Sequence, residues 1–181
     1  KQRDPKELVE YNFDKSDSMV LPSDWNTKDE RLFFYEGNVW FKKSFTYHPQ
    51  ENRRTILYFG AINYEAYVWV NGRKAGYHIG GFTAFNMDVT DLLRDGENFI
   101  VVKVDNRRSA ESIPTLNFDW WNYGGITRDI MLVDLAPVYV ENYSLQLDRK
   151  DFNKIHFSAK LSEAQAGKSV RLKIDELGID K

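Results

Sequence analysis

The stretch from Phe118 to Asp129 concentrates the most distinctive side chains of this sequence. It places several aromatic rings, the carboxylate of Asp119, the amide of Asn122 and a Gly pair in one short run. A carboxylate and an amide among aromatic faces suit a sugar, whose hydroxyls need hydrogen bonds and whose C–H faces stack on rings. The same residues also fit an aromatic plug that closes a β-sandwich, because composition alone does not define a site.

Composition and charge narrow the classes of protein. With 42% hydrophobic and 29% charged residues among 181, the chain has the balance of a globular protein, and 15% aromatic residues favour strands. A formal charge of -2 offers no basic field for nucleic acid. No apolar run approaches the roughly 18 residues of a membrane span, so no membrane partner is expected.

The absence of cysteine removes several kinds of site. The sequence contains 0 cysteines, which excludes structural disulfides, thiolate zinc sites and a Cys nucleophile. No cofactor or metal is expected. Lys1–Pro5 does not resemble a signal peptide. The compartment stays open, with a periplasmic or extracellular location favoured slightly over a cytoplasmic one.

Short β-strands must position the distinctive stretch. An irregular lead-in up to Asp24 is expected to pack Trp25 inward, and alternation then begins at Val39 and runs to Tyr47. Further strands are predicted over Thr55–Phe59, Glu65–Val70, Arg73–His78, Ala84–Val89, Phe99–Val104 and Ile130–Val133. One helical turn, Thr90–Leu93, is expected with Thr90 as its cap. A long polar loop, Asp105–Asn117, leads into the distinctive stretch.

The predicted strands form hairpins with one face toward a core. Asn71-Gly72 between two β-rich runs is typical of a type I′ turn, which needs positive φ at both residues. Ala66, Val68 and Val70 should face the core, with Tyr67 and Trp69 on the opposite face. Many short strands with Gly-marked turns predict an all-β fold, an antiparallel β-sandwich of jelly-roll type.

After Pro137 the strand pattern restarts. Three strands are predicted around Tyr143–Leu147, Ile155–Leu161 and Val170–Ile174. An immunoglobulin-like sandwich needs about seven strands, so this tail is expected to be the beginning of such a domain, cut short. The predicted domains are therefore residues 1–136, the sandwich, and 137–181, the incomplete immunoglobulin-like segment.

Several ordered motifs carry a family resemblance. They are Glu36-Gly37-Asn38-Val39-Trp40-Phe41, Tyr64 to Gly72, Gly80 to Phe85, Val89-Thr90-Asp91-Leu92-Leu93, Gly96-Glu97-Asn98 and Asn122 to Asp129. From about Leu21 to Pro137 the chain resembles the N-terminal sugar-binding domain of glycoside hydrolase family 2. That family holds β-galactosidases, β-glucuronidases and β-mannosidases. The tail resembles the start of the family's immunoglobulin-like domain.

The resemblance implies a role without catalysis. The family carries its catalytic carboxylates in a (β/α)₈ barrel, which needs about 250 residues and is absent here. Retaining hydrolysis needs two carboxyls about 5 to 5.5 Å apart, so the chain alone is expected to be inactive although the parent protein should be a retaining O-glycosyl hydrolase. The family's usual first strand, Gly-x-Trp-x-Phe, has no counterpart before Trp25, so a trimmed front end is also expected.

The resemblance also assigns candidate substrate-binding residues. It implies that Asp119 orients the sugar held by the catalytic domain, the alternative being a loop-capping Asp. One of the two adjacent Trp rings, Trp120, is expected to face the ligand while Trp121 enters the core. Asn38 either faces the barrel mouth or serves a left-handed turn. No catalytic residue is predicted, and His78 is interpreted as structural.

Alternative functions remain open at this point. The sequence is compatible with three functions. The chain could serve as an accessory domain of a family 2 glycosidase, as an autonomous carbohydrate-binding module, or chiefly as a docking or oligomerisation surface. The expected partners are a glycoside substrate and the remaining domains of the parent enzyme, with homo-oligomerisation left open. The runs Gly37–Trp40 and Asn122–Ile126 resemble β-glucuronidases slightly more than β-galactosidases.

Overall fold

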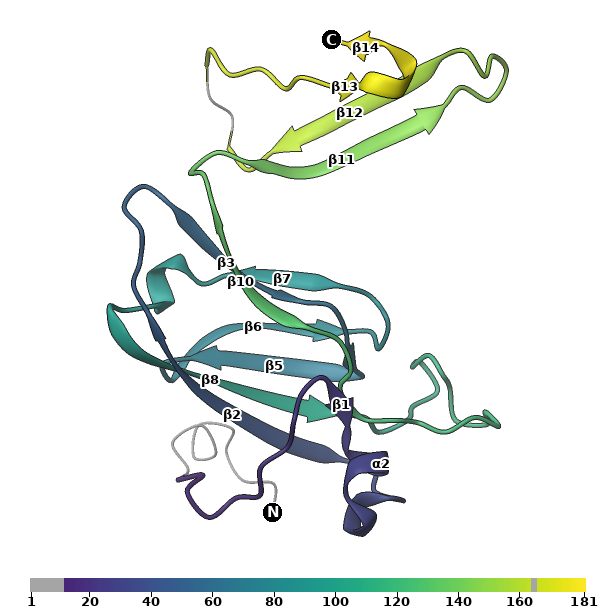
Figure 1. Ribbon diagram of the computed structural model, residues 1–181. Helices are drawn as coiled ribbons and strands as arrows, with labels where there is room; N and C mark the ends of the chain where they lie inside the picture. The colour runs from purple at the N-terminus through teal and green to yellow at the C-terminus, as the bar shows by residue number, and fades with distance from the viewer. Residues whose placement is uncertain (1–11, 164–165) are drawn as a thin grey trace. The chain divides into compact units, whose positions relative to one another are not determined.

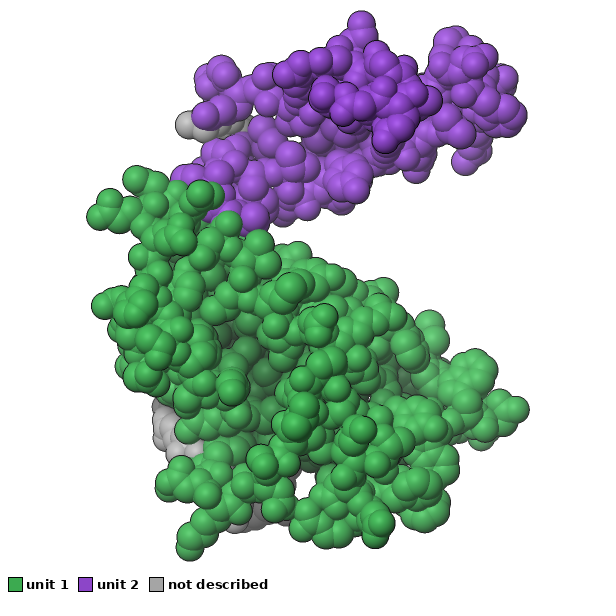
Figure 2. Space-filling model, viewed as in Figure 1, with its two compact units in different colours: residues 1–134 green, residues 135–181 purple. Residues whose placement is uncertain are grey.

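The structure is a computed structural model that describes residues 12–163 and 166–181, and it consists of two compact units, 1–134 and 135–181 (Figures 1 and 2). The first part of the predicted lead-in, residues 1–11, lies outside the described residues.

From residue 12 onward, the larger unit is built from short strands and three very short helices. In chain order its elements are β1 (Ser23–Asp24), α2 (Trp25–Lys28), η1 (Glu30–Leu32), β2 (Asn38–Tyr47), β3 (Arg54–Phe59), β4 (Ile62–Asn63), β5 (Glu65–Val70), β6 (Arg73–Ile79), β7 (Phe85–Asp88), η2 (Thr90–Leu92), β8 (Gly96–Asp105), β9 (Gly125–Ile126) and β10 (Ile130–Leu135), the last of which runs into the second unit.

Two antiparallel sheets enclose the core of this unit. One sheet has the strand order β2-β8-β5-β6 and the other β10-β3-β7, as Figure 1 shows. Ala66, Val68 and Val70 from the first sheet and Leu57 and Phe59 from the second are all buried in one cluster. Burial of apolar area between two sheets is the main driving force for such a sandwich. The predicted all-β sandwich fold is confirmed.

The hairpin between β5 and β6 forms as the Asn-Gly pair predicts. Asn71 and Gly72 have φ values of 51° and 79°, the positive values that a type I′ turn requires. On the outer face of the same sheet, Trp69 and Val101 form a second small cluster with Trp40, Tyr67 and Phe99 packed against it. The predicted division of β5 between core and outer face is thus confirmed.

Trp25 is the anchor of the core at one end of the sandwich. It is fully buried, and Gly124 packs so closely on its indole that a Cβ at that glycine would lie 2.1 Å from Cζ2. Gly125 lies in β9, which pairs with both β1 and β4, and has φ of 153°. The two glycines therefore allow close approach of Trp25 and β1.

The helical turn after β7 forms without its predicted cap. In η2 no side chain caps the helix, and its flanking residue is Val89. The hydroxyl of Thr90 instead donates to Asp88 Oδ1 at 2.6 Å and accepts from the Thr55 amide at 2.9 Å. Thr90 thereby links η2 to β3, a long-range role that local capping rules do not reveal.

The smaller unit contains two separate antiparallel pairs. Its elements are β11 (Val140–Leu147), β12 (Ile155–Leu161), β13 (Lys173–Ile174), η3 (Asp175–Leu177) and β14 (Ile179–Asp180). β11 pairs with β12, and β13 with β14. The strand predicted over Val170–Ile174 is confined to Lys173–Ile174, because this segment pairs only with the short β14.

Candidate functional site

The segment between β8 and β9 carries the residues that the sequence singled out. Asp119 lies at an exposed bend, and its carboxylate makes no hydrogen bond or ion pair within residues 12–163 and 166–181. Trp120 is 55% exposed, and its ring lies 3.6 Å from that of Phe118 between centroids. A carboxylate without a partner on an exposed loop keeps its full capacity to accept hydrogen bonds.

Buried amides hold both ends of this segment in place. Asn106 Nδ2 donates to the carbonyl of Asn122 at 3.0 Å, and Asn122 Nδ2 donates back to the carbonyl of Asn106. Asn63, in β4, donates through Nδ2 to Asn122 Oδ1 at 3.1 Å and to the carbonyl of Tyr123. All three asparagines are at most 5% exposed, so each bond is shielded from water and costly to leave unmade.

A fourth buried amide ties the segment to the polypeptide after α2. The Gly124 amide donates to Asn26 Oδ1 at 2.9 Å, and Asn26 Nδ2 points to the carbonyls of Leu32, Phe33 and Tyr35 at 3.0 to 3.1 Å. One side chain therefore joins two segments that lie far apart in the sequence. The rings beside these backbone atoms are held in a fixed arrangement.

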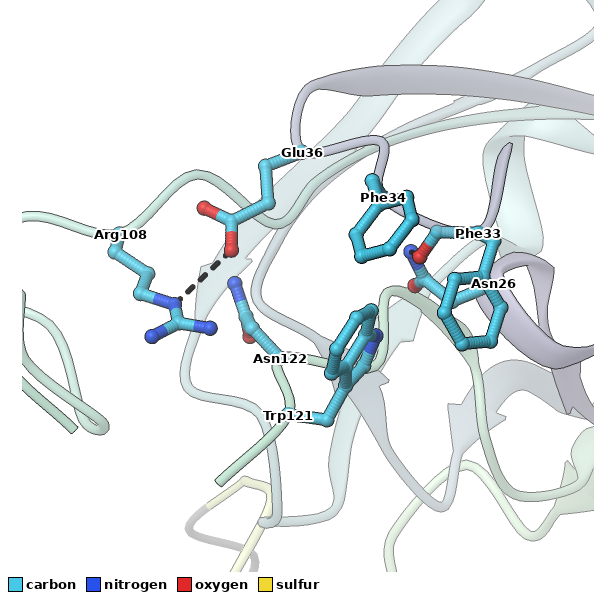
Figure 3. A pocket seen from close by; sticks show the side chains of 7 residues that line it. All are labelled: Asn26, Phe33, Phe34, Glu36, Arg108, Trp121 and Asn122. Carbon is cyan, nitrogen blue, oxygen red and sulfur yellow. Dashed lines mark hydrogen bonds and ion pairs between the residues drawn. The ribbon is translucent and has the colours of Figure 1, made fainter. Parts of the chain in front are cut away.

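Between these two segments lies a cavity of about 250 Å³, drawn in Figure 3. Its lining residues are Asn26, Phe33, Phe34, Glu36, Arg108, Trp121 and Asn122. Phe33 and Phe34 meet edge to face at 4.9 Å, and the Trp121 ring lies 4.9 Å from Phe33 and 5.4 Å from Phe34. The cavity thus has one aromatic wall.

The opposite side of the cavity is charged. Arg108 Nε lies 3.0 Å from Glu36 Oε1, and Figure 3 shows the two side chains facing each other. The contact is an ion pair without hydrogen-bond alignment, since the buried Nε–H finds no aligned acceptor among the described residues. Arg108 Nη1 also donates to the carbonyl of Phe118 at 3.3 Å, which connects the pair to the loop that carries Asp119.

Next to the site, Asp105 ends β8 in a buried position with Arg107 as partner. Burial acts to raise the pKa of Asp105, but hydrogen bonds from the Arg107 side chain and amide outweigh it and hold this pKa below its usual value. Arg107 Nη2 lies 2.5 Å from Asp105 Oδ2. The pair fixes the start of the long loop.

His78 lies away from the cavity and behaves as a structural residue. Its ring stacks on Phe85 at 4.0 Å, and burial lowers its pKa. Within the described ranges, 12–163 and 166–181, no three His, Asp or Glu residues are grouped to hold a metal ion. In the same ranges no helix is long and apolar enough to cross a membrane.

The structure separates the three predicted substrate-binding residues. Asp119 and Trp120 are neighbours on the exposed loop, whereas Asn38 begins β2 opposite Asp105. That strand position rules out a left-handed turn at Asn38, whose buried Oδ1 has no partner among the described residues. None of the three lines the cavity described above. Their roles toward a substrate remain predictions.

The prediction that Trp121 enters the core is wrong. Trp121 is 36% exposed and lines the cavity, while Trp25 fills the core beneath Gly124. The buried amides hold this stretch so that the backbone rather than the indole faces inward. Rings of both Trp120 and Trp121 are consequently available at the surface.

Sequence reasoning also missed the other side of the cavity. Phe33 and Phe34 precede β2 in a stretch for which no role was predicted, Glu36 was quoted only as the start of a family motif, and Arg108 was treated only as part of a polar loop. The signal was the run Leu32–Tyr35, four apolar residues without strand alternation in a polar context. Two of them, Phe33 and Phe34, are 45% and 81% exposed, which a packing role alone does not require.

Comparison with known proteins identifies related sequences and folds. A family model described as glycosyl hydrolases family 2, sugar binding domain, matches residues 2–136. A protein of Formosa agariphila provisionally named a β-glucuronidase is 33% identical over 150 residues, which are 81% of this chain and 18% of that protein. A β-galactosidase of Clostridium acetobutylicum is 36% identical over 112 residues, or 61% of this chain and 12% of that protein.

A solved structure supports the same relationship. The β-glucuronidase of an uncultured Clostridium species superimposes with a TM-score of 0.77 at 29% identity, covering 87% of this chain and 30% of that one. The present chain therefore spans less than a third of the length of these relatives.

Proposed function

Because the chain belongs to family 2 of the glycosyl hydrolases, we propose that it is the sugar-binding part of a β-glucuronidase or β-galactosidase type of enzyme. In this role it is non-catalytic by itself, helps to form the substrate pocket and supports a separate catalytic barrel. The observation that carries the proposal is the exposed carboxylate of Asp119, which pairs with none of the described residues, on a loop whose ends are held by buried amides.

Asp119 is the proposed contact to the substrate. A carboxylate accepts hydrogen bonds from two sugar hydroxyls, and an analogue that lacks them leaves the carboxylate unpaired. Retaining hydrolysis needs a protonated acid and a nucleophile about 5 to 5.5 Å apart, and a single carboxylate supplies only one of these. Asp119 is accordingly a residue that orients substrate, with Trp120 and Asn38 as secondary contacts.

The proposal includes the division of the chain into domains. Residues 1–136 form the sugar-binding sandwich, and residues 137–181 are the first strands of an immunoglobulin-like domain. The hairpin of β11 and β12 supports this division, because antiparallel hairpins with one apolar face are the building units of such sandwiches. The remaining domains of the parent enzyme are the proposed protein partners.

Hydrolysis assays test the non-catalytic role. The full gene product should hydrolyse aryl β-glucuronides or β-galactosides, and the 181-residue chain alone should show no turnover above buffer. Turnover by the chain alone would contradict the proposal.

A binding titration separates the alternative function. The exposed rings of Phe34, Trp120 and Trp121 also fit an autonomous carbohydrate-binding module. Such a module would bind a soluble polysaccharide saturably as the 181-residue chain, whereas the proposed domain should show no more than feeble affinity in isothermal titration. Saturable polymer binding would favour the module over the composite pocket.

A further inference from the structure

The cavity drawn in Figure 3 has the form of a small-molecule subsite, separate from the loop carboxylate of Asp119. Its volume of about 250 Å³ is slightly below the range of about 300 to 1,000 Å³ that is typical of drug-sized ligands. Like those sites, it combines an apolar wall with a few converging polar groups. Its size and lining suit one ring of a small polar ligand.

The aromatic wall fits the C–H face of a pyranose. Phe33, Phe34 and Trp121 contact one another at ring distances of 4.9 to 5.4 Å and yet stay 45%, 81% and 36% exposed. Exposed ring surface beside a cavity costs solvation free energy that a bound apolar face would recover. The axial C–H groups of a sugar ring supply such a face.

The charged side fits hydroxyl groups. A sugar hydroxyl donates to a carboxylate and accepts from a guanidinium, so the Glu36 and Arg108 pair complements two adjacent hydroxyls. The pair stays open to a ligand, because the side chains of Arg108 and Glu36 are 21% and 37% exposed. An ionised ligand carboxylate has no proton to donate to Glu36, so it cannot replace the donating hydroxyl and would be repelled where it approaches the Glu36 oxygens.

The floor of the cavity is preorganised. Asn122 and Asn26 are 5% and 2% exposed, and their amides are engaged with backbone groups from both sides of the cavity. Ligand binding therefore does not need to order these segments, which reduces the entropic cost. We infer that this cavity binds a neutral pyranose with adjacent hydroxyls, as a second ring of an oligosaccharide beyond the ring that Asp119 contacts.

The position of this ring relative to Asp119 rests on the proposed function, whereas binding in the cavity does not. A measurement local to the cavity therefore keeps the two apart. The full gene product is labelled with 5-fluorotryptophan, and the ¹⁹F resonance of Trp121 is assigned with a Trp121→Phe variant. Three probes are then titrated separately. Methyl β-glucopyranoside and cellobiose are neutral and have one and two rings, whereas methyl β-glucuronide has one ring and a carboxylate at C6.

The Trp121 resonance should shift saturably with each of the two neutral probes. The dissociation constant of the glucuronide, measured through the same resonance, should be at least about 10-fold higher. Phe34→Ala should weaken neutral binding about 3- to 10-fold, as expected for the loss of one stacked ring. Tyr77→Ala, which removes a ring that is 61% exposed on β6 outside the cavity, should change nothing. Glu36→Gln should weaken neutral binding about 10-fold.

Three results would overturn the inference. They are the absence of a saturable shift with either neutral probe, equal binding by the Phe34→Ala and Tyr77→Ala variants, and binding of the glucuronide as tight as that of the glucoside. None of these measurements depends on turnover. A negative result here therefore does not contradict the role of Asp119, and binding in the cavity can still be measured if Asp119 has no such role.

Discussion

At the scale of single residues, Asp105 shows how a buried carboxylate is kept charged near the site. Its side chain is only 7% exposed, and Arg107 approaches it through Nε, Nη2 and its amide. Hydrogen bonds to a charged group typically contribute about 1.5 to 3 kcal/mol each. Without them, burial would favour the protonated acid.

This balance predicts how stability depends on pH. The pKa of Asp105 is lower in the folded than in the unfolded state, so its stabilising contribution is complete above about pH 4 and is lost as pH falls through the folded pKa. Arg107→Ala should raise this pKa and lower the free energy of unfolding at pH 7 by about 1 to 3 kcal/mol, and this difference from the parent chain should shrink as pH falls toward 3. Urea unfolding from pH 3 to 7 measures both effects.

The matched control is Arg53→Ala, which removes an exposed arginine immediately before β3. Its unfolding free energy should follow that of the parent chain at every pH. If Arg107→Ala and Arg53→Ala give the same pH profile, the pair does not stabilise Asp105.

At the scale of elements, the buried asparagines position the loop that carries Asp119. Asn122→Ala leaves the carbonyl of Asn106 without its side-chain donor and removes an acceptor from Asn63. The free energy of unfolding should fall by about 1 to 3 kcal/mol, the cost of buried groups left unpaired. Thermal or urea unfolding measures the change.

Asn117→Ala provides the control for this variant. Asn117 lies on the same loop but is exposed, so its replacement should stay within about 0.5 kcal/mol of the parent chain. Equal losses for the two variants would show that the amide bonds do not hold the loop.

The strands were largely predictable because their signals are local. Glu65–Val70 is observed with the predicted bounds, and Asn71-Gly72 forms the predicted turn. Alternating burial and turn propensity act over a few residues, so the sequence carries them directly. In contrast, the two-residue strands β1, β4 and β9 exist only through pairing with one another, and no local pattern marked them.

The site was less predictable because it depends on long-range contacts. Asn26, Asn63, Asn106 and Asn122 have the same residue type as loop asparagines, and only the fold shows that they are buried and bonded to one another or to Gly124. Trp121 was expected in the core, but Trp25 occupies that space from another part of the chain. Family resemblance directed attention to Asp119, whereas the cavity residues emerged only from the structure.

At the scale of the whole molecule, the two units differ in how well they bury side chains. In unit 1, β8 pairs with both β2 and β5 and contributes several fully buried residues. In unit 2, every described residue is at least partly exposed, including Tyr143 at 70% and Leu147 at 59%. An isolated two-stranded hairpin is only marginally stable in water.

Hydrogen exchange of the 181-residue chain should reflect this difference. Amides in the centre of β8 should exchange only on global unfolding, and those of β11 and β12 should exchange about 1,000-fold faster or more after correction for intrinsic rates. Mass spectrometry or NMR resolves the two regions. Equal protection in β8 and β11 would contradict independent stability of the units.

The central claim is that this chain contributes Asp119 to the substrate pocket of a larger glycosidase. The most direct measurement is kcat/KM for an aryl glycoside with the full gene product carrying Asp119→Asn, beside Glu111→Gln as a charge-matched control on the same exposed loop. Loss of hydrogen bonds to a charged acceptor predicts a fall of about 10- to 100-fold for Asp119→Asn and no change for Glu111→Gln. A kcat/KM within a factor of about two of the parent value for Asp119→Asn would contradict the account.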